Sequence, residues 1–253
     1  MGIVFAQQIN KSAKLDKEAT KKNIKAFTKI ADANARLEKC QSDLLNQLQI
    51  NAKRKNGLIT YHLSMFQEQY SIIRKIQFGR GKGIEKLDVI QNQIRQYVEL
   101  PAVTSGMIMK KSQYAISFAL MGIGGVMIKE SKMNLKTASK NKAMASAVTA
   151  QIDSICIALE GITQHTMIIT ELLEKLGMLY MKSIKNISII LKNNGLDSEN
   201  YSEDDINALN VSLSLTKLIY RIINTPLLDE NGNIEKESIK VIQQGRDMLK
   251  QIQ

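Results

Sequence analysis

Residues that commonly carry catalysis or bind metals are few in this chain and far apart. The two histidines, His62 and His165, have no Cys, His or carboxylate neighbour at the spacing that a zinc or di-iron site needs. Glu171 and Glu174 lie about one helical turn apart, but no E-x-x-H pattern accompanies them. The G-x-S-x-G motif and the signatures of a cysteine nucleophile are absent from the sequence. We therefore predict a protein without a metal, a cofactor or an enzymatic activity.

Two glycine-containing segments look like ligand-binding loops but lack the spacing of such loops. Residues 78–83 read FGRGKG, and backbone N–H groups in a loop of this kind can hold phosphate. The segment lacks the Walker spacing and follows a helix, not a strand, so we favour a hinge or hairpin tip over anion binding. The acidic segment 229–233 fails the EF-hand spacing, because Gly232 comes too early and no glutamate holds the twelfth position. A plain turn is expected there.

The two cysteines and the first residues of the chain bear on the compartment. Cys40 and Cys156 each fall on an apolar helical stripe, where a free thiol behaves as a small hydrophobic side chain, so no disulfide framework is expected. The short apolar patch Gly2–Ala6 has no basic region before it and no cleavage site after it. We predict cytoplasmic synthesis without a secretory signal, followed by membrane association or release by a non-classical route.

Composition points to an all-α fold with a basic surface. The 253 residues include only two prolines and no tryptophan, and Lys, Gln, Ile, Leu, Met and Ala, which favour or tolerate helices, are plentiful. Residues 1–195 hold 29 Lys and Arg against 14 Asp and Glu, whereas residues 196–253 hold 6 against 10. A body this basic favours anionic partners such as lipid head groups or nucleic acid; the alternative is a lysine-rich surface that only keeps the protein soluble.

Hydrophobic periodicity predicts two helices before residue 78. From about Lys14 to Ala52, apolar residues recur at spacings of four and three and mark one face of a helix. Asn56-Gly57 is expected to end this helix and Ile59–Ile73 to form the next, which the short connection makes an antiparallel neighbour. A third helix is predicted at about 84–99, because Pro101 disfavours helical geometry in the residue before it.

The clearest signal is a heptad repeat between residues 148 and 190. A strict repeat of 3.5 residues implies a left-handed supercoil against a partner helix, within the chain or across subunits. A helix over 139–193 would be about 80 Å long, and Asn194-Gly195 is expected to end it. The seam that we predict to pair with the partner includes Ile152, Ile155, Leu159, Ile162, Ile169, Leu173, Leu176 and Tyr180.

The C-terminal region, 202–253, is acidic and is predicted to form two further helices. Ser202 and Asp205 have the spacing of a capping box at the start of the first, and the 229–233 turn separates it from the second. We therefore expect one elongated domain over 1–253, an antiparallel helical bundle with long coiled-coil-like helices. Its predicted parts are the N-terminal helices 14–99, an apolar segment 106–130, the heptad helix 139–193 and the C-terminal helices 202–253.

The most unusual segment of the chain is Ser112–Ile128. These 17 residues carry no charge, and Lys110 and Lys111 precede them while Lys129 follows. A helix of this length reaches about 25 Å, the short end of what spans a bilayer core, and the lysines could reach the lipid head groups at both ends. The residues that we predict to enter lipid are Tyr114, Phe118, Leu120, Met121, Gly122, Ile123, Gly124, Gly125, Val126, Met127 and Ile128.

In architecture the chain resembles the cytolysin A-type helical pore-forming proteins. The likeness lies in the long N-terminal helices, the apolar stretch Tyr114–Ile128, the rod Ser139–Asn193 after it and the polar C-terminal helices. It covers most of the chain. The resemblance implies lipid binding, oligomerisation and permeabilisation, and it assigns no role to any individual residue.

Two functional hypotheses follow. The first is a membrane-associated, oligomerising helical protein that perturbs membranes or forms pores through residues 112–128, with anionic lipid as its partner and Lys110, Lys111 and Lys129 as head-group anchors. The second is a soluble helical scaffold or interaction module that pairs through the 148–190 seam with a helical protein or another copy, with residues 112–128 as buried core. Nucleic acid ranks below both, because no helix-turn-helix signature or interleaved aromatic residues accompany the basic residues.

Overall fold

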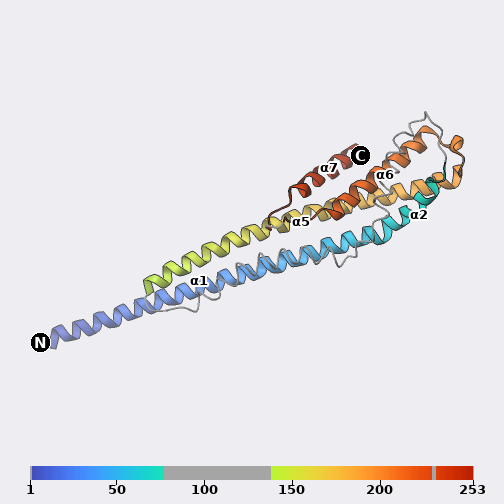
Figure 1. The fold of residues 1–253 in the computed structure, drawn as a ribbon. Coiled ribbons are helices and arrows are strands. Elements are labelled where there is room, and N and C mark those ends of the chain that lie inside the picture. Colours follow the sequence, from blue (N-terminus) through green and yellow to red (C-terminus); the bar gives the residue numbers. More distant parts are fainter. Residues whose placement is uncertain (1, 77–137, 230–231, 253) are drawn as a thin grey trace. The chain divides into compact units, whose positions relative to one another are not determined.

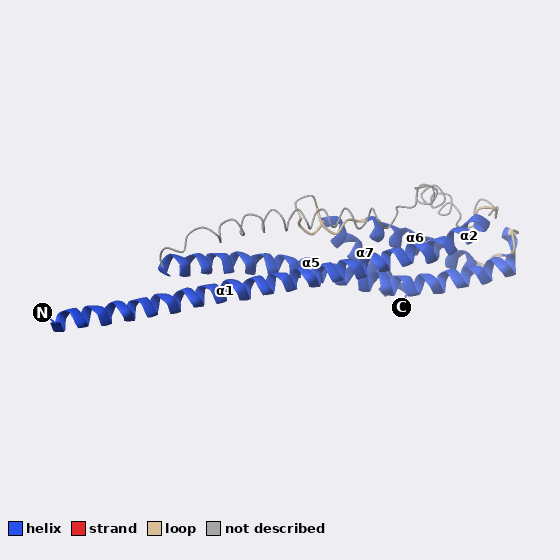
Figure 2. Cartoon of the chain, turned by 90° about the horizontal axis from the view of Figure 1, so that it is seen from below, coloured by secondary structure: helices blue, strands red, loops and turns tan. Residues whose placement is uncertain are grey.

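The computed structural model describes residues 2–76, 138–229 and 232–252, and these are almost entirely helical (Figures 1 and 2). Within them no strand forms, and Leu228 and Ile234 make one isolated bridge. The predicted all-α fold with long helices is confirmed. The helices are α1 (Gly2–Gly57), the π-helical turn η1 (Leu58–Leu63), α2 (Ser64–Ile73), α5 (Ala138–Asn194), the 3₁₀ turn η2 (Ser198–Asn200), α6 (Glu203–Asn224) and α7 (Lys236–Ile252).

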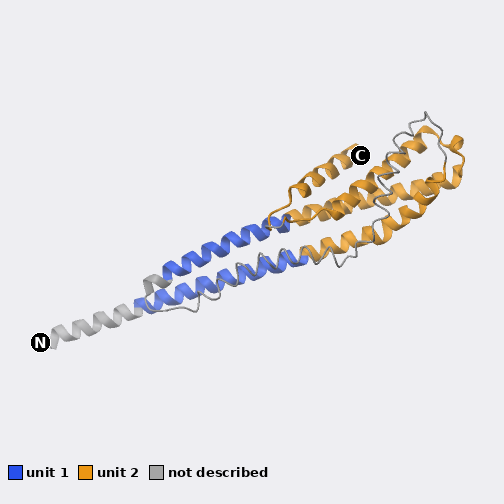
Figure 3. Ribbon diagram, viewed as in Figure 1, with its two compact units in different colours: residues 1–46, 118–164 blue, residues 47–117, 165–253 orange. Residues whose placement is uncertain are grey.

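Contacts between residues divide the chain into two compact units, coloured separately in Figure 3. Unit 1 comprises Met1–Asn46 and Phe118–Gln164, and unit 2 comprises Gln47–Ser117 and His165–Gln253. The sequence suggested one domain over 1–253. In the structure, α1 and α5 each contribute residues to both units.

The predicted break at Asn56-Gly57 is wrong. Gly57 has right-handed helical angles, φ −60° and ψ −41°, and the chain continues through the π-helical turn η1 directly into α2. A glycine that ends a helix commonly takes positive φ, as Gly195 does after α5 with φ 67°. The predicted helices 14–52 and 59–73 therefore follow one another as continuous helix and are not antiparallel neighbours. The predicted helix at 84–99 and the apolar segment 106–130 lie outside the described residues.

Helices α1 and α5 run parallel in each unit. In unit 1, Arg36 forms an ion pair with Asp153 at 2.7 Å, and the Cys40 thiol lies 3.7 Å from Glu160 Oε1, so partners 117 and 120 residues apart meet in the same order. In unit 2, Asn51 Nδ2 donates to Thr170 Oγ1 over 2.9 Å, again with a separation of 119 residues. A constant separation between partners is the register of a parallel helix pair.

Helix α6 runs antiparallel to α5, as the short connection between them requires. The hydroxyls of Tyr180 and Thr216 are hydrogen-bonded at 2.8 Å, and Asn194 Nδ2 donates to Asp205 Oδ2 over 3.1 Å. The predicted capping box is present, since Ser202 and Asp205 each bond the other's backbone N–H. The predicted end of the long helix at Asn194 is likewise confirmed.

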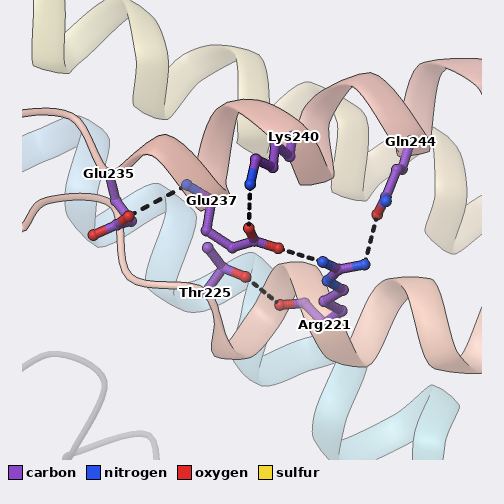
Figure 4. Close-up of polar contacts among 6 residues, drawn as sticks. All are labelled: Arg221, Thr225, Glu235, Glu237, Lys240 and Gln244. Carbon is purple, nitrogen blue, oxygen red and sulfur yellow. Dashed lines mark hydrogen bonds and ion pairs between the residues drawn. The ribbon is translucent and has the colours of Figure 1, made fainter.

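Helix α7 is fixed to α6 by polar side chains (Figure 4). Arg221 on α6 forms an ion pair with Glu237 and donates to Gln244 Oε1 over 3.0 Å. Lys240 adds a second cation 3.5 Å from the Glu237 carboxylate. Helix α7 also approaches α5 closely at Gly245, where a Cβ atom would lie 2.6 Å from Leu172 Cδ2. Only glycine fits at this crossing without displacing Leu172.

The apolar core is concentrated in unit 2, where residues of α1, η1, α2, α5, α6 and α7 form one cluster around Leu173, Leu176 and Tyr180, all fully buried. In unit 1 the described core is small. Ala33, Ile152 and Cys156 are its buried members, with Leu37, Cys40 and Val148 packed beside them. Since burial of apolar area is the main stabilising contribution to folding, we expect unit 2 to be the more stable unit.

Candidate functional site

The predicted membrane segment is not among the residues that the structure describes. Residues 112–128, including every insertion candidate from Tyr114 to Ile128, lie outside the described ranges, as do Lys110, Lys111 and Lys129. Within those ranges one helix, Lys142–Asn194, is long and apolar enough by length and composition to cross a membrane. This helix forms most of α5, whose apolar seam packs in the cores of the two units, and the core helix of a soluble protein passes the same test.

The residues of the predicted helix-pairing seam are covered by other parts of the same chain. Ile152 and Leu159 are buried in unit 1, with Ile155 and Ile162 half-buried. In unit 2 the remaining four positions are all buried, and they pack in the main core. These four are Ile169, Leu173, Leu176 and Tyr180. The seam therefore packs against helices of its own chain.

Beside this seam, α1 places two polar residues in the core of unit 2. Asn51 and Lys55 are both 3% exposed and continue the inward-facing stripe of the helix. Asn51 bonds Thr170, whereas Lys55 Nζ donates to the backbone oxygen of Ile223 over 2.9 Å. Ile223 lies in the last turn of α6, where carbonyl oxygens lack a partner within the helix and the helix dipole is negative. Lys55 therefore caps the C-terminal end of α6.

This position disfavours the charged form of the Lys55 side chain. Burial lowers the pKa of Lys55 to about 8 from its ordinary 10.5. Lys55 forms no ion pair with the described residues, so the hydrogen bond to the Ile223 carbonyl oxygen is the interaction that offsets the cost of burying its charge. A buried lysine held by a helix end is consistent with a structural role and is inaccessible to a substrate.

His165, the second candidate for chemistry in the sequence, is used structurally. Its Nε2 lies 2.7 Å from Ser238 Oγ, and the Ser238 hydroxyl donates its one hydrogen to the Glu235 oxygen over 2.6 Å. Ser238 must then accept from His165, which assigns the proton to Nε2. Burial also lowers the pKa of His165, so the ring is neutral at pH 7. His165 therefore ties α5 to the start of α7.

The two cysteines come together in unit 1. Cys40 on α1 packs against Cys156 on α5, both thiols are free, and they line a hollow of about 570 Å³ with Arg36, Asp153 and Glu160. Burial first, and then the neighbouring Cys156 and Glu160, raise the pKa of the Cys40 thiol to about 11. No group of three or more metal-binding side chains occurs in the described part of the chain.

Alkylation of Cys40 at pH 8 is expected to be about 100-fold slower than that of an unfolded cysteine, since the thiolate is the nucleophile and a pKa near 11 depletes it. The rate should rise steadily as the pH approaches 11. Iodoacetamide labelling followed by peptide mass spectrometry measures Cys40 and Cys156 separately, and the urea-unfolded chain provides the reference rate. Equal labelling of the folded and unfolded chains at pH 8 would contradict this environment.

A larger groove of about 680 Å³ lies in unit 2, between α5 and the end of α1 with η1. Its floor is the buried pair Leu58 and Leu173, and its walls are Ile50, Tyr61 and Met178, which are 42%, 67% and 59% exposed. Basic side chains stand at its rim. The rim residues are Lys53, Arg54, Lys182 and the acidic Glu174, which pairs with Arg54 at 3.0 Å.

Sequence reasoning did not identify this groove or the Lys55 cap. Asn51 and Lys55 continue the spacing of four and three begun by Leu44 and Leu48. This spacing could have indicated that both polar residues lie on the buried face of the helix. For the groove the signal was subtler. Gly57 and Gly177 lie 120 positions apart, close to the register that pairs the two helices, but that register is visible only in the structure.

Comparison with known proteins adds no relative to this description. No protein-family model, curated protein or solved structure matches the chain. The functional argument below therefore depends on the chemistry of this chain alone.

Proposed function

We propose that this protein is a membrane-associated, oligomerising helical protein whose residues 112–128 enter the lipid hydrocarbon. The observation that carries the proposal is the run of seventeen uncharged residues bounded by Lys110, Lys111 and Lys129. Apolar side chains in such a run gain about 25 cal/mol for each Å² removed from water, and the flanking ammonium groups can remain among anionic head groups. Gly122, Gly124 and Gly125 permit the close helix approach that assembly in lipid requires.

The described part of unit 1 offers a second contact for an anionic surface. Ile24 and Phe27 on α1 are 60% and 55% exposed, one turn apart on the same side of the helix. Four exposed lysines lie close to them in sequence on the same helix, at positions 21, 22, 25 and 29. Apolar side chains among lysines suit the membrane interface, where each lysine near an anionic surface contributes about 1 kcal/mol.

The 148–190 seam favours membrane association over the scaffold alternative. A scaffold that recruits partners through this seam needs its apolar positions accessible, and none of the eight predicted seam positions is exposed. Pairing with another chain through them would require α1, α6 and α7 to leave α5, at the cost of the main core. Oligomer contacts are therefore assigned to the lipid-bound segment.

Liposome flotation tests the proposal. The wild type is expected to float with anionic vesicles and to float less as salt rises, because salt screens the lysines. Ile123→Asp should remain in the soluble fraction, since a carboxylate in the hydrocarbon costs about 3 kcal/mol. The matched control is Ile157→Asp, at a position 69% exposed on α5, which should float like the wild type.

Each result decides the matter. A wild type that stays soluble with anionic vesicles overturns membrane association. An Ile123→Asp variant that floats as the wild type does overturns the insertion of residues 112–128 into lipid. Cross-linking of the floated protein should yield multimers, whereas a monomer on vesicles would remove the oligomerisation claim.

A further inference from the structure

The groove of unit 2 has a glycine on each of the two helices that form it, since Gly57 on α1 and Gly177 on α5 both line it. A Cβ atom on Gly177 would lie 2.9 Å from Leu58 Cδ2, so any other residue there would have to displace the end of the Leu58 side chain. A Cβ atom on Gly57 would meet no atom of the described residues within 4 Å. Glycine inside a helix costs about 0.5–1 kcal/mol relative to alanine, and packing among the described residues does not explain that cost at Gly57.

The helix also changes its winding at this groove. Leu58, Tyr61 and His62 belong to the π-helical turn η1, and all three line the groove. Short π-helical turns interrupt regular hydrogen bonding and occur frequently at functional sites. His62 Nδ1 is buried, and within the described part of the chain it has no hydrogen-bond partner. A buried ring nitrogen without a partner is costly unless a ligand or water completes it.

The electrostatic character of the rim is positive. Arg54 is paired with Glu174, whereas Lys53 and Lys182 form no ion pair with the described residues. Two cations thus remain beside an apolar groove with exposed Tyr61 and Met178 walls. Between Ile50 and His62 the groove follows α1 and η1 for about 18 Å, at 1.5 Å per residue.

We infer that this groove binds a single-chain anionic amphiphile, with its acyl chain over Gly57 and Gly177 and its acidic head beside Lys53 or Lys182. The hollow of about 680 Å³ has the size of a small-molecule site. Its apolar floor and walls suit the chain, and the unpaired ammonium groups suit the head. The inference does not require residues 112–128 to enter a membrane.

Titration calorimetry with decanoate, below its micelle concentration, tests the inference. Gly57→Leu should abolish the binding seen with the wild type, because the new side chain fills the hollow where space is open. Leucine also favours the helix, so the variant is expected to melt no lower than the wild type. The matched control is Gly161→Leu in unit 1, where a Cβ atom likewise meets no described atom within 4 Å. It should bind decanoate normally.

Two further variants keep the test decisive. Met178→Ala removes an exposed wall without filling the groove and should weaken decanoate binding, which covers the case in which Gly57→Leu fails to fold. The double substitution Lys53→Gln and Lys182→Gln should weaken decanoate binding about fivefold and leave binding of the neutral decanol unchanged. Equal weakening of both ligands would contradict recognition of the acidic head.

Failure of this inference can be told apart from failure of membrane association. Gly57→Leu should float with vesicles as the wild type does, and Ile123→Asp should still bind decanoate. The inference is overturned if the wild type does not bind decanoate, or if Gly57→Leu binds it as tightly as the wild type. It is also overturned if the wild type forms a concentration-dependent dimer that Gly57→Leu abolishes, because the occupant would then be a second copy.

Discussion

Replacing Tyr180 by alanine should lower the free energy of unfolding of unit 2 by about 4 kcal/mol, which is within the usual range for truncating a buried aromatic side chain to alanine. Tyr180 is fully buried in the core. Its ring packs 6.3 Å from His62 and 5.9 Å from Phe66, centre to centre. The truncation would also leave Thr216 without its 2.8 Å hydroxyl partner inside the core.

Two tyrosine variants separate the causes of this loss. Tyr180→Phe keeps the ring and removes only the hydroxyl, so it should cost about 1 kcal/mol. Tyr61→Ala removes a ring that is 67% exposed and should change stability by less than about 0.5 kcal/mol. The free energy of unfolding of all three variants can be measured by urea unfolding monitored by circular dichroism. This method suits a chain that has no tryptophan to report by fluorescence. A Tyr180→Ala protein whose free energy of unfolding falls by less than about 1 kcal/mol, where about 4 kcal/mol is expected, would contradict the described core.

Between pH 7 and pH 10.5, the largest pH effect on stability should come from Lys55. Its pKa is about 8 in the folded protein and 10.5 in the unfolded chain, so between these values the unfolded chain holds a proton that the folded one has lost. Stability from this group therefore rises with pH across that window and is constant below it. A shift of this size corresponds to about 3 kcal/mol.

The comparison that isolates Lys55 is the wild type against Lys55→Met. Between pH 7 and pH 10.5, the wild type should gain about 3 kcal/mol of stability relative to the variant. Cys40 and Tyr180, whose pKa values are raised by burial, titrate in both proteins and cancel from the difference. Lys53→Met, on the exposed side of the same helix, is the control for replacing a lysine of α1 by methionine. A pH-independent difference for Lys55→Met would show that the amine is not buried as described.

The sequence predicted those features that depend on local pattern. The heptad spacing places one apolar face on α5, and that face is buried or half-buried from Ile152 to Ile190 because apolar side chains at this period must be covered. The capping box at Ser202 and the glycine after Asn194 depend on groups a few residues apart, so they too could be derived from local sequence. These features required no knowledge of the partner helix.

Sequence pattern failed where the outcome depends on residues far away in the chain. Asn56-Gly57 resembles a helix end, but Gly57 stays helical and η1 adds a π-helical turn before Phe66 and Tyr70 enter the core. The parallel pairing of α1 with α5 was not predicted for the same reason, because its register joins positions about 120 apart. Lys55 and the groove beside Gly177 depend on that register, so periodicity alone could not assign them.

The most direct test of membrane association is the depth of residue 123 in a bilayer. Ile123→Cys, in a chain carrying Cys40→Ser and Cys156→Ser, can be labelled with an environment-sensitive fluorophore and mixed with anionic vesicles. We predict blue-shifted emission that lipids brominated at mid-chain quench and aqueous iodide does not. The same label at Ile157→Cys should stay in water. Emission from position 123 that vesicles leave unchanged would contradict the proposal.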